Sequence, residues 1–190
     1  ELTVNSATDL NYFYQSPTFY APAVMLDRLN LLEFGVPSNG GSGPVFSLNE
    51  FASEGQFEPL LKSLQTNMSP IGLDVHYELN ETTRELYVKL EGELLGDFEA
   101  KGLRVGVMTI EDNILGTQTG MAGKYNHTHI VRSFFTSVYG DYTSVSNGAF
   151  TMEFVDVLKD KFVLDNMRLA VWVGKNASTS NFNGFNIYQA

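Results

Sequence analysis

Two of the chain's three histidines lie one residue apart, within residues 124–134. In an extended chain, side chains two positions apart project from the same face, so His127 and His129 could direct both imidazoles at one metal ion. Arg132 follows three positions after the second histidine and adds a cation to the same short stretch. The spacing is therefore compatible with a metal-dependent enzyme centred on His127 and His129.

A metal centre needs at least one further ligand, and here the sequence offers two readings. His76, Glu111 and Asp112 are residues of the right type, but nothing local brings them near the histidine pair. In the alternative reading, the imidazoles form hydrogen bonds with loop backbone where a strand begins, as buried polar groups require. An isolated His-x-His pattern favours this structural role over the metal site.

Other catalytic arrangements are not supported. The serines lack a Gly-x-Ser-x-Gly setting, so no nucleophile for a Ser-His-Asp triad stands out. Glu111 and Asp112 are adjacent, and neighbouring side chains on a strand point to opposite faces, which excludes a paired-carboxylate glycosidase. We expect these two carboxylates to lie in a solvated turn after a strand. The sequence thus predicts a non-enzymatic protein without a cofactor.

The composition excludes several classes of protein. The 190 residues carry a formal net charge of -10, which opposes binding to nucleic acid and docking on anionic lipid. There is no cysteine, so this chain has no disulfide framework, thiolate metal site or CxxC redox centre. No apolar run approaches the roughly 18 residues of a membrane-spanning helix. We expect a folded domain whose partner is a protein or a glycan.

The first third of the chain predicts a small α/β segment, residues 1–68. Pro22 precedes the apolar run 23–26, which is short enough for a buried strand, and a Gly-rich loop follows at 40–44. A segment of this size cannot bury a core alone, so it must pack on the rest of the chain or on a partner. A helix is predicted after the loop from apolar residues at helical spacing, Phe57, Leu60, Leu61 and Leu64.

From residue 69 the pattern changes to the period of two that is typical of strands. Apolar and polar residues alternate over 71–79 and again over 86–90, with a short turn between them, which predicts a β-hairpin with one solvent-exposed face. With no helical pattern between the strand candidates, residues 69–190 predict an antiparallel β-sandwich of immunoglobulin or jelly-roll type. The further strand candidates are 103–111, 129–139, 149–155, 168–174 and 185–189.

Aromatic residues raise a third choice of function, the binding of a sugar. Trp172 lies in a strand candidate of which either face could be the buried one, and an exposed ring there could stack on a glycan. Aromatic side chains also crowd the N-terminal segment, where we favour a buried seam between the two parts of the chain. A carbohydrate-binding module therefore stays an alternative to a protein-binding one. The aromatic residues near the C-terminus are Phe182, Phe185 and Tyr188.

Four short signals occur in an order that resembles a known family, at residues 113–118, 125–132, 169–173 and 188–190. Together they resemble the C-terminal half of the Omp-twenty-eight-related outer membrane proteins of Bacteroidetes-type bacteria, over most of residues 70–190. The resemblance implies a structural or binding role for the residues that match its signature. These residues are Gln118, Tyr125, Asn126, His127, His129 and Arg132.

The resemblance also implies a thioredoxin-like domain followed by a β-sandwich. Residues 16–28 resemble the proline loop and following strand of such a domain, with Pro22 as the position to test for a cis peptide bond. The half that would carry cysteines is absent, so we expect this chain to be a piece of a longer protein. The family implies export to the outer membrane, cell surface or periplasm, with a lipid anchor on the missing N-terminus and a non-enzymatic binding or scaffolding role.

Overall fold

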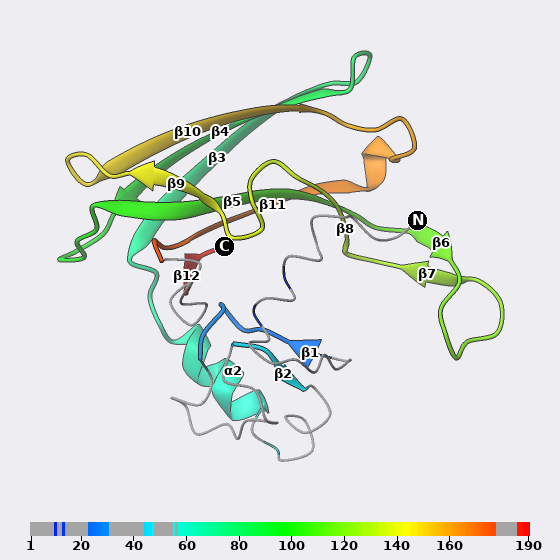
Figure 1. The fold of residues 1–190 in the computed structure, drawn as a ribbon, viewed down its shortest axis with the longest axis horizontal. Helices are drawn as coiled ribbons and strands as arrows, with labels where there is room; N and C mark the ends of the chain where they lie inside the picture. The colour runs from blue at the N-terminus through cyan, green and yellow to red at the C-terminus, as the bar shows by residue number, and fades with distance from the viewer. Residues whose placement is uncertain are drawn as a thin grey trace.

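The computed structural model describes residues 10, 13, 23–30, 44–47, 55, 57–177 and 186–190. Its main feature is a pair of antiparallel β-sheets that enclose one hydrophobic core (Figure 1). The predicted fold class, a mainly β protein built on an antiparallel sandwich, is confirmed.

The first sheet contains three strands in the order β10–β4–β3. Asn80 closes the predicted hairpin between β3 and β4, because its Oδ1 accepts hydrogen bonds from the backbone N–H groups of Thr82 and Thr83 at 3.0 and 3.1 Å. This local turn sets the register of two ten-residue strands. The strands are β3 (Ile71–Asn80), β4 (Glu85–Leu94) and β10 (Ala149–Val157).

The second sheet has the order β12–β11–β5–β8, and β9 pairs with β5 beyond the end of β8. A single 3₁₀ turn, η3 (Leu164–Asn166), leads into β11. The long central strands β5 and β11 pair over nine residues, so they form the rigid middle of this sheet. The strands are β5 (Gly102–Glu111), β8 (Ile130–Phe134), β9 (Asp141–Ser144), β11 (Met167–Lys175) and β12 (Ile187–Gln189).

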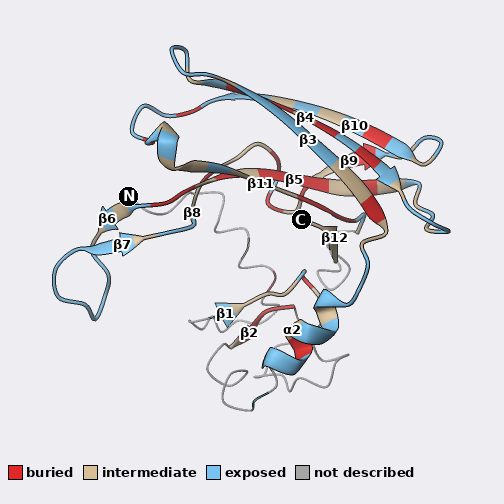
Figure 2. Cartoon of the chain, turned by 180° about the vertical axis from the view of Figure 1, so that it is seen from behind, coloured by how far each residue is buried: buried red, intermediate tan, exposed pale blue. Residues whose placement is uncertain are grey.

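The core between the sheets is built from alternate residues of the strands. Because each strand presents every second side chain to the same face, the alternation that predicted the strands also fills the interior. Burying an apolar side chain of this size contributes roughly 1.5–3 kcal/mol, and Figure 2 shows the buried positions along the two central strands. These are Leu86, Val88 and Leu90 of β4, and Leu103, Val105 and Val107 of β5.

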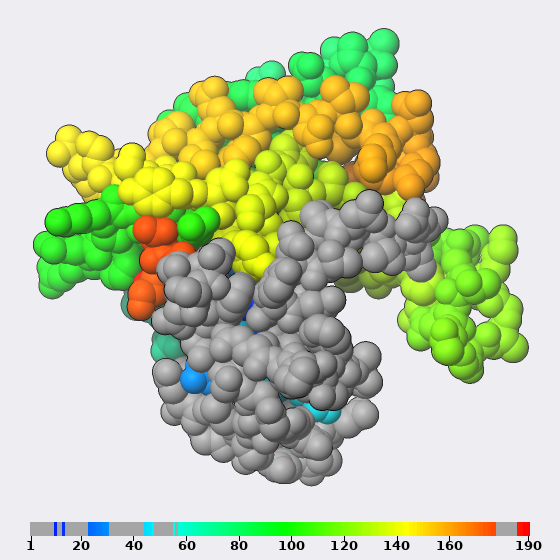
Figure 3. All heavy atoms as spheres, viewed as in Figure 1, coloured from blue at the N-terminus to red at the C-terminus, as the bar shows by residue number. Residues whose placement is uncertain are grey.

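The segment between β5 and β10 differs from the prediction. The single strand expected over 129–139 is wrong, because β8 ends at Phe134 and a turn follows, in which the Ser137 N–H donates to Asp141 Oδ1 at 3.0 Å. Two short strands, β6 (Ile114–Gly116) and β7 (Tyr125–His127), form a hairpin between the strand candidates 103–111 and 129–139, where no strand was predicted. This hairpin stands out from the body of the molecule (Figure 3).

The described part of the N-terminal segment contains β1 (Ala23–Val24), β2 (Phe46–Ser47) and α2 (Phe57–Gln65). The predicted helix is thereby confirmed. Buried Phe46 and Leu60 form a small cluster of their own, apart from the core of the sandwich. Pro22, the position predicted for a cis peptide bond, lies outside the described residues.

A buried cation joins this segment to the second sheet. The guanidinium of Arg28 lies 4.2 Å from the ring centre of Trp172 and 4.8 Å from that of Phe13, and its Nη2 donates to the Val138 carbonyl at 2.7 Å. Burial lowers the pKa of Arg28 to about 10, so the group stays charged at neutral pH. Trp172 is therefore covered on the outer face of its sheet, which makes the predicted use of an exposed Trp172 for sugar binding wrong.

The helix α2 ends at Gln65 and β3 begins at Ile71, on either side of the predicted boundary between 1–68 and 69–190. The division into two domains at this point stays a prediction, as does the likeness of the first part to a thioredoxin-like domain. Among the described residues, no helix has the length and apolar character needed to cross a membrane.

Candidate functional site

The predicted signature residue Arg132 lies in an irregularity of the second sheet. Thr109 of β5 pairs with Ser133, whereas the next residue, Ile110, pairs with Val131. Arg132 is thus the extra residue of a β-bulge, which kinks the strand and re-aims its side chain. This geometry turns a charged side chain into the end of the sandwich rather than into solvent.

Inside the sandwich, Arg132 forms an ion pair with Glu111. Arg132 Nε lies 2.9 Å from Glu111 Oε2, and the side chains are 8% and 4% exposed. The guanidinium also lies over the ring of Phe162 at 4.4 Å, and the other oxygen of Glu111 accepts the Val163 N–H at 2.9 Å. A pair this well buried needs such additional contacts to offset its desolvation. Arg132 is therefore a buried residue whose charge is paired with Glu111 inside the sandwich.

Asp112, the residue after the end of β5, forms a separate set of hydrogen bonds. Its Oδ1 accepts the backbone N–H of His129 at 2.7 Å, and its Oδ2 accepts from Arg168 Nε at 2.6 Å. Glu111 and Asp112 thus have separate partners, as expected for adjacent residues of a strand. The expectation that they lie in a solvated turn is wrong, since they are only 3% and 7% exposed. Their cationic and N–H partners make this burial tolerable.

The two histidines do not share one face of an extended strand. His127 ends β7, but His129 has a φ of 56°, a left-handed conformation that interrupts the alternation on which the metal prediction relied. The ring of His129 is 71% exposed, with Nδ1 3.9 Å from Asp112 Oδ1. Nε2 of His127, in contrast, is buried and has no hydrogen-bond partner among the residues that the structure describes. Within the described ranges, no three His, Cys, Asp or Glu residues are placed to hold a metal ion.

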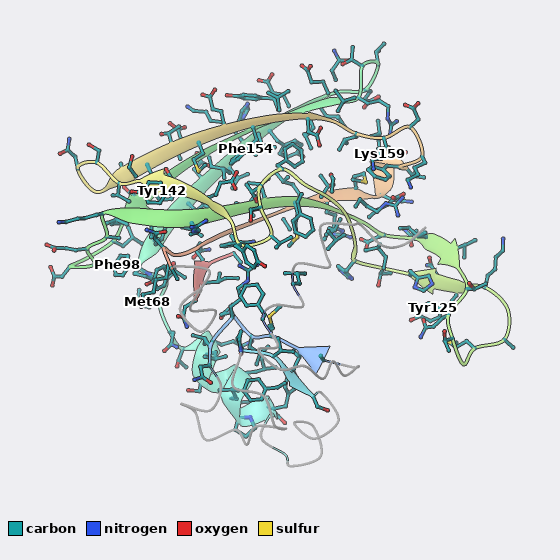
Figure 4. The ribbon with its side chains drawn as sticks, in the orientation of Figure 1. Met68, Phe98, Tyr125, Tyr142, Phe154 and Lys159 are labelled. Carbon is teal, nitrogen blue, oxygen red and sulfur yellow. The ribbon has the colours of Figure 1, made fainter. Side chains whose placement is uncertain are left out.

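The backbone N–H of His129, rather than its imidazole, makes the hydrogen bond at this strand entry, and its acceptor is the Asp112 carboxylate. The other signature residues belong to the projecting hairpin. Gln118 accepts a backbone hydrogen bond from Met121 at 3.1 Å. The ring of Tyr125 meets that of His127 edge-on, with centroids 5.0 Å apart, and is exposed on the hairpin (Figure 4).

Asn126 connects the same hairpin to the sandwich. Its Nδ2 donates to Asn113 Oδ1 at 3.3 Å, and Asn113 Nδ2 in turn donates to Asn166 Oδ1 at 3.4 Å. The structure therefore places Asn126, His129 and Arg132 at the base of the hairpin, and it places Gln118 and Tyr125 further out.

The carboxylate of Asp112 makes stability depend on pH. The backbone N–H of His129 and the guanidinium of Arg168 lower its pKa below the ordinary value of 3.8. The carboxylate therefore contributes its full stabilisation at pH values above its pKa in the unfolded chain. This stabilisation is lost as the pH falls through its lower pKa in the folded protein. We expect the urea midpoint of the wild type to fall more steeply below about pH 4 than that of Asp112→Asn.

The fluorescence of Trp172, the single tryptophan, reports this unfolding. Asp97→Asn, a change in an exposed turn, is the control and should follow the wild-type curve. Parallel pH profiles for the wild type and Asp112→Asn would contradict the assignment.

A second site lies at the β3 edge of the first sheet, where the sandwich is open between β3 and β11. The opening is a cleft of about 650 Å³, within the size range of ligand sites. Leu86, Thr109 and Leu158 also line it. We call it the inter-sheet cleft and define it by two apolar walls. One wall consists of Leu73, Val75, Tyr77 and Leu79 of β3, and the other consists of Leu164, Met167, Leu169 and Val171.

The cleft is open because the last strand is short. β12 has three residues and pairs with β11 at Val173 and Gly174, so among the described residues no strand flanks the first half of β11 on that side. Side chains that point inward from β3 therefore stay in contact with solvent, and Val75 and Tyr77 are 36% and 61% exposed. Apolar side chains exposed together in this way are typical of an interaction site.

The buried polar network positions one wall of this cleft. Arg84 donates from Nε to the Leu158 carbonyl at 3.0 Å and from Nη2 to the Phe162 carbonyl at 2.8 Å. Glu111 holds the next residue, Val163, through its N–H. These bonds fix the loop between β10 and η3, which supplies Leu158 to the cleft and leads into Leu164, the first residue of η3.

The inter-sheet cleft was not predicted from the sequence. The alternation over 71–79 correctly predicts one apolar face of β3, but it does not show which strand covers that face. The shortness of the strand candidate at 185–189 was the available signal, since a short edge strand leaves part of its neighbour uncovered.

No protein-family model matches the sequence, and no curated protein matches it either. Among solved structures, HBP35 of Porphyromonas gingivalis is similar, with a TM-score of 0.71 and 18% identity over 97% of this chain and 55% of that chain. A domain of the outer membrane lipoprotein Omp28 from Porphyromonas gingivalis has a TM-score of 0.41 and 16% identity, over 65% of this chain and 85% of that chain.

This chain thus spans 55% of the HBP35 chain. At 18% identity, the likeness concerns the fold alone. Nearly the whole chain, sandwich and preceding segment together, shares its fold with part of HBP35 of Porphyromonas gingivalis.

Proposed function

We propose that this protein is an exported, non-enzymatic binding module of the cell envelope, and that it binds its partner in the inter-sheet cleft. The observation that carries the proposal is the exposure of Val75 and Tyr77, two inward-facing residues that a closed sandwich would bury. Leaving such side chains in water opposes folding, so their retention at one margin is explained by a partner that covers them.

The charged groups near the cleft are already engaged in structural contacts. Glu111 and Arg132 bind each other, and Asp112 binds His129 and Arg168. A binding role needs no reacting group, whereas a general acid or base would need a titratable group free to exchange a proton with a substrate. The apolar lining also favours an apolar partner over a glycan.

The location in the envelope is supported by the sequence signals that resemble the Omp-twenty-eight-related proteins. Fractionation of the native host tests it, with the protein expected in the periplasmic or membrane fraction. Recovery in the cytosolic fraction would contradict this part of the proposal.

Binding in the cleft is tested with the uncharged apolar dye N-phenyl-1-naphthylamine. We expect saturable fluorescence enhancement with the wild type and about tenfold weaker binding to Tyr77→Asn, which corresponds to about 1.4 kcal/mol. Val155→Asn is the matched control, because Val155 is an apolar strand residue of the same sheet and is 60% exposed against 61% for Tyr77. Equal binding by the two variants, or no saturable binding, would contradict the proposal.

A further inference from the structure

The margin of the inter-sheet cleft is an unpaired strand edge. β3 pairs with β4 on one side, and within the described residues no strand pairs with it on the other. An exposed strand edge offers a row of backbone donors and acceptors to which another extended chain can bind. Figure 2 shows β3 exposed along most of its length.

The hydrogen-bond pattern identifies the residues of β3 whose backbone faces this edge. The Leu95 N–H donates to the Pro70 carbonyl at 2.9 Å, one step beyond the pair formed by Ile71 and Leu94. Because bonded and non-bonded pairs alternate in an antiparallel ladder, the even-numbered residues of β3 bond to β4 and the odd-numbered ones face away. The contacts of Ile71 fit this pattern, because its backbone groups bond to Ser69 and not to β4. Its N–H donates to the Ser69 hydroxyl at 3.1 Å, and its carbonyl accepts from that hydroxyl at 2.9 Å.

The same odd-numbered residues direct their side chains into the cleft. Leu73, Val75, Tyr77 and Leu79 thus combine edge-facing backbone groups with cleft-lining side chains. A chain that added to this edge would span about 20 Å alongside them. Every second side chain of the added strand would enter the cleft, so those residues have to be apolar.

The other face of the added strand would meet an acidic surface. Across the three strands of the first sheet, the outward positions carry many carboxylates, with Lys89 and His76 as the basic groups on those positions. These two already lie 3.0 Å from Glu91 and 3.2 Å from Glu78. Opposite charges on neighbouring strands stabilise a sheet and like charges destabilise it. The outward carboxylates are Asp74, Glu78, Glu85, Glu91, Glu93 and Glu153.

We propose that the inter-sheet cleft receives an extended segment of a partner protein, in which apolar residues alternate with lysine or arginine. The segment adds to β3 as a fourth strand of the first sheet. Its apolar side chains fill the cleft, and its basic side chains lie beside Asp74 and Glu78. This inference rests on the proposed binding function and names the class of partner.

The test uses the full 190-residue chain and a fluorescein-labelled peptide of nine residues in which valine and lysine alternate. Fluorescence anisotropy is expected to show saturable binding. A peptide with glutamate in place of lysine should bind at least tenfold more weakly. A peptide of the same composition with its valines and lysines in two blocks should also bind at least tenfold more weakly, because it cannot present one apolar face.

A backbone control separates strand addition from simple charge attraction. N-methylation of every second amide removes the donors along one edge of the peptide and keeps its charge and apolar side chains. Of the two possible N-methylated peptides, one should lose binding and the other should retain it. Equal binding by both would overturn the inference.

Protein variants locate the contact. Glu78→Lys should weaken binding of the valine–lysine peptide about tenfold and strengthen binding of the valine–glutamate peptide. Glu153→Lys makes the same change of charge on β10, at the other margin of the first sheet, and should leave both affinities within about twofold. Equal effects of the two variants would overturn the assignment to β3.

The dye and the peptide distinguish the two levels of the proposal. Dye binding that depends on Tyr77, with no binding of any peptide, would overturn strand addition and leave the cleft as a site for an apolar molecule. Loss of both would overturn the proposed function as well. Sedimentation that shows a dimer, abolished by Glu78→Lys, would overturn the inference by making a second copy of this chain the occupant.

Discussion

Replacing Gly106 by alanine is expected to destabilise the protein by about 3 kcal/mol, the upper part of the range for overpacking a core. Gly106 lies on β5 under the indole of Trp172, and a Cβ atom at this position would overlap the ring. The ring cannot move away easily, because Gly140 lies against its far edge and the guanidinium of Arg28 lies 4.2 Å from its centre. Urea unfolding followed by circular dichroism measures the effect.

Gly72→Ala is the matched control, because it also adds one methyl group to a strand glycine. Its new Cβ would lie 3.1 Å from Cγ of Glu93, an exposed and flexible side chain that can move aside. We expect a change within about 1 kcal/mol.

A double variant tests whether the indole causes the loss. In Gly106→Ala with Trp172→Leu, the smaller side chain leaves room for the methyl group, so the combined destabilisation should be less than the sum of the single effects. An unchanged midpoint for Gly106→Ala, or strict additivity in the double variant, would contradict the close contact between Gly106 and Trp172.

Replacing Arg132 by methionine is expected to cost about 3–5 kcal/mol, because it leaves the carboxylate of Glu111 buried without its cation. Both side chains are almost inaccessible to water, and Arg132 additionally packs on Phe162. Glu111→Leu alone should also be strongly destabilising, since it isolates the guanidinium and removes the acceptor for the Val163 N–H. Denaturant unfolding at neutral pH measures both.

The double variant Arg132→Met with Glu111→Leu should recover part of this loss, because no uncompensated charge remains. Lys89→Met is the control for a more accessible pair of similar length, since Lys89 and Glu91 lie 3.0 Å apart on the outer face of the sheet with side chains 32% and 54% exposed. It should cost less than about 1 kcal/mol. A loss for Arg132→Met as small as that of Lys89→Met would show that the buried pair has no special role.

The Arg132 variant also connects the signature residues to the proposed function. The Glu111–Arg132 pair contacts Phe162 and Val163, in the loop that carries Leu158 and precedes Leu164 of η3, two residues that line the inter-sheet cleft. If the proposed function holds, Arg132 supports the cleft without lining it.

The strands of the sandwich were predictable because their signal is local. Alternation over 71–79 and 86–90, with Asn80 at the turn, identifies the hairpin, since each strand must bury one face and wet the other. The helix beginning at Phe57 was predictable for the same reason, from its apolar spacing. Between residues 113 and 144 the prediction was poorer, because bulges and left-handed residues such as His129 break the period of two.

The candidate site was only partly predictable. The sequence singled out His127, His129 and Arg132 as chemically distinctive, but not the bulge that aims Arg132 at Glu111 or the left-handed backbone that turns His129 toward Asp112. Arg132 lies 21 positions after Glu111 in the chain, and His129 lies 17 positions after Asp112. Periodicity within one strand carries no information about such contacts.

By itself, the amino-acid sequence determined an acidic, cysteine-free chain whose second part alternates as strands and which forms a short helix from residue 57. The tertiary structure decided which of the apolar faces are covered. Trp172 is enclosed because Arg28 packs over its ring and Phe13 packs on Arg28. Tyr77 is exposed because, among the described residues, β12 pairs with only the end of β11 and no strand closes the cleft. Burial depends on what lies opposite a side chain, and that neighbour is set by the packing of distant strands rather than by local sequence.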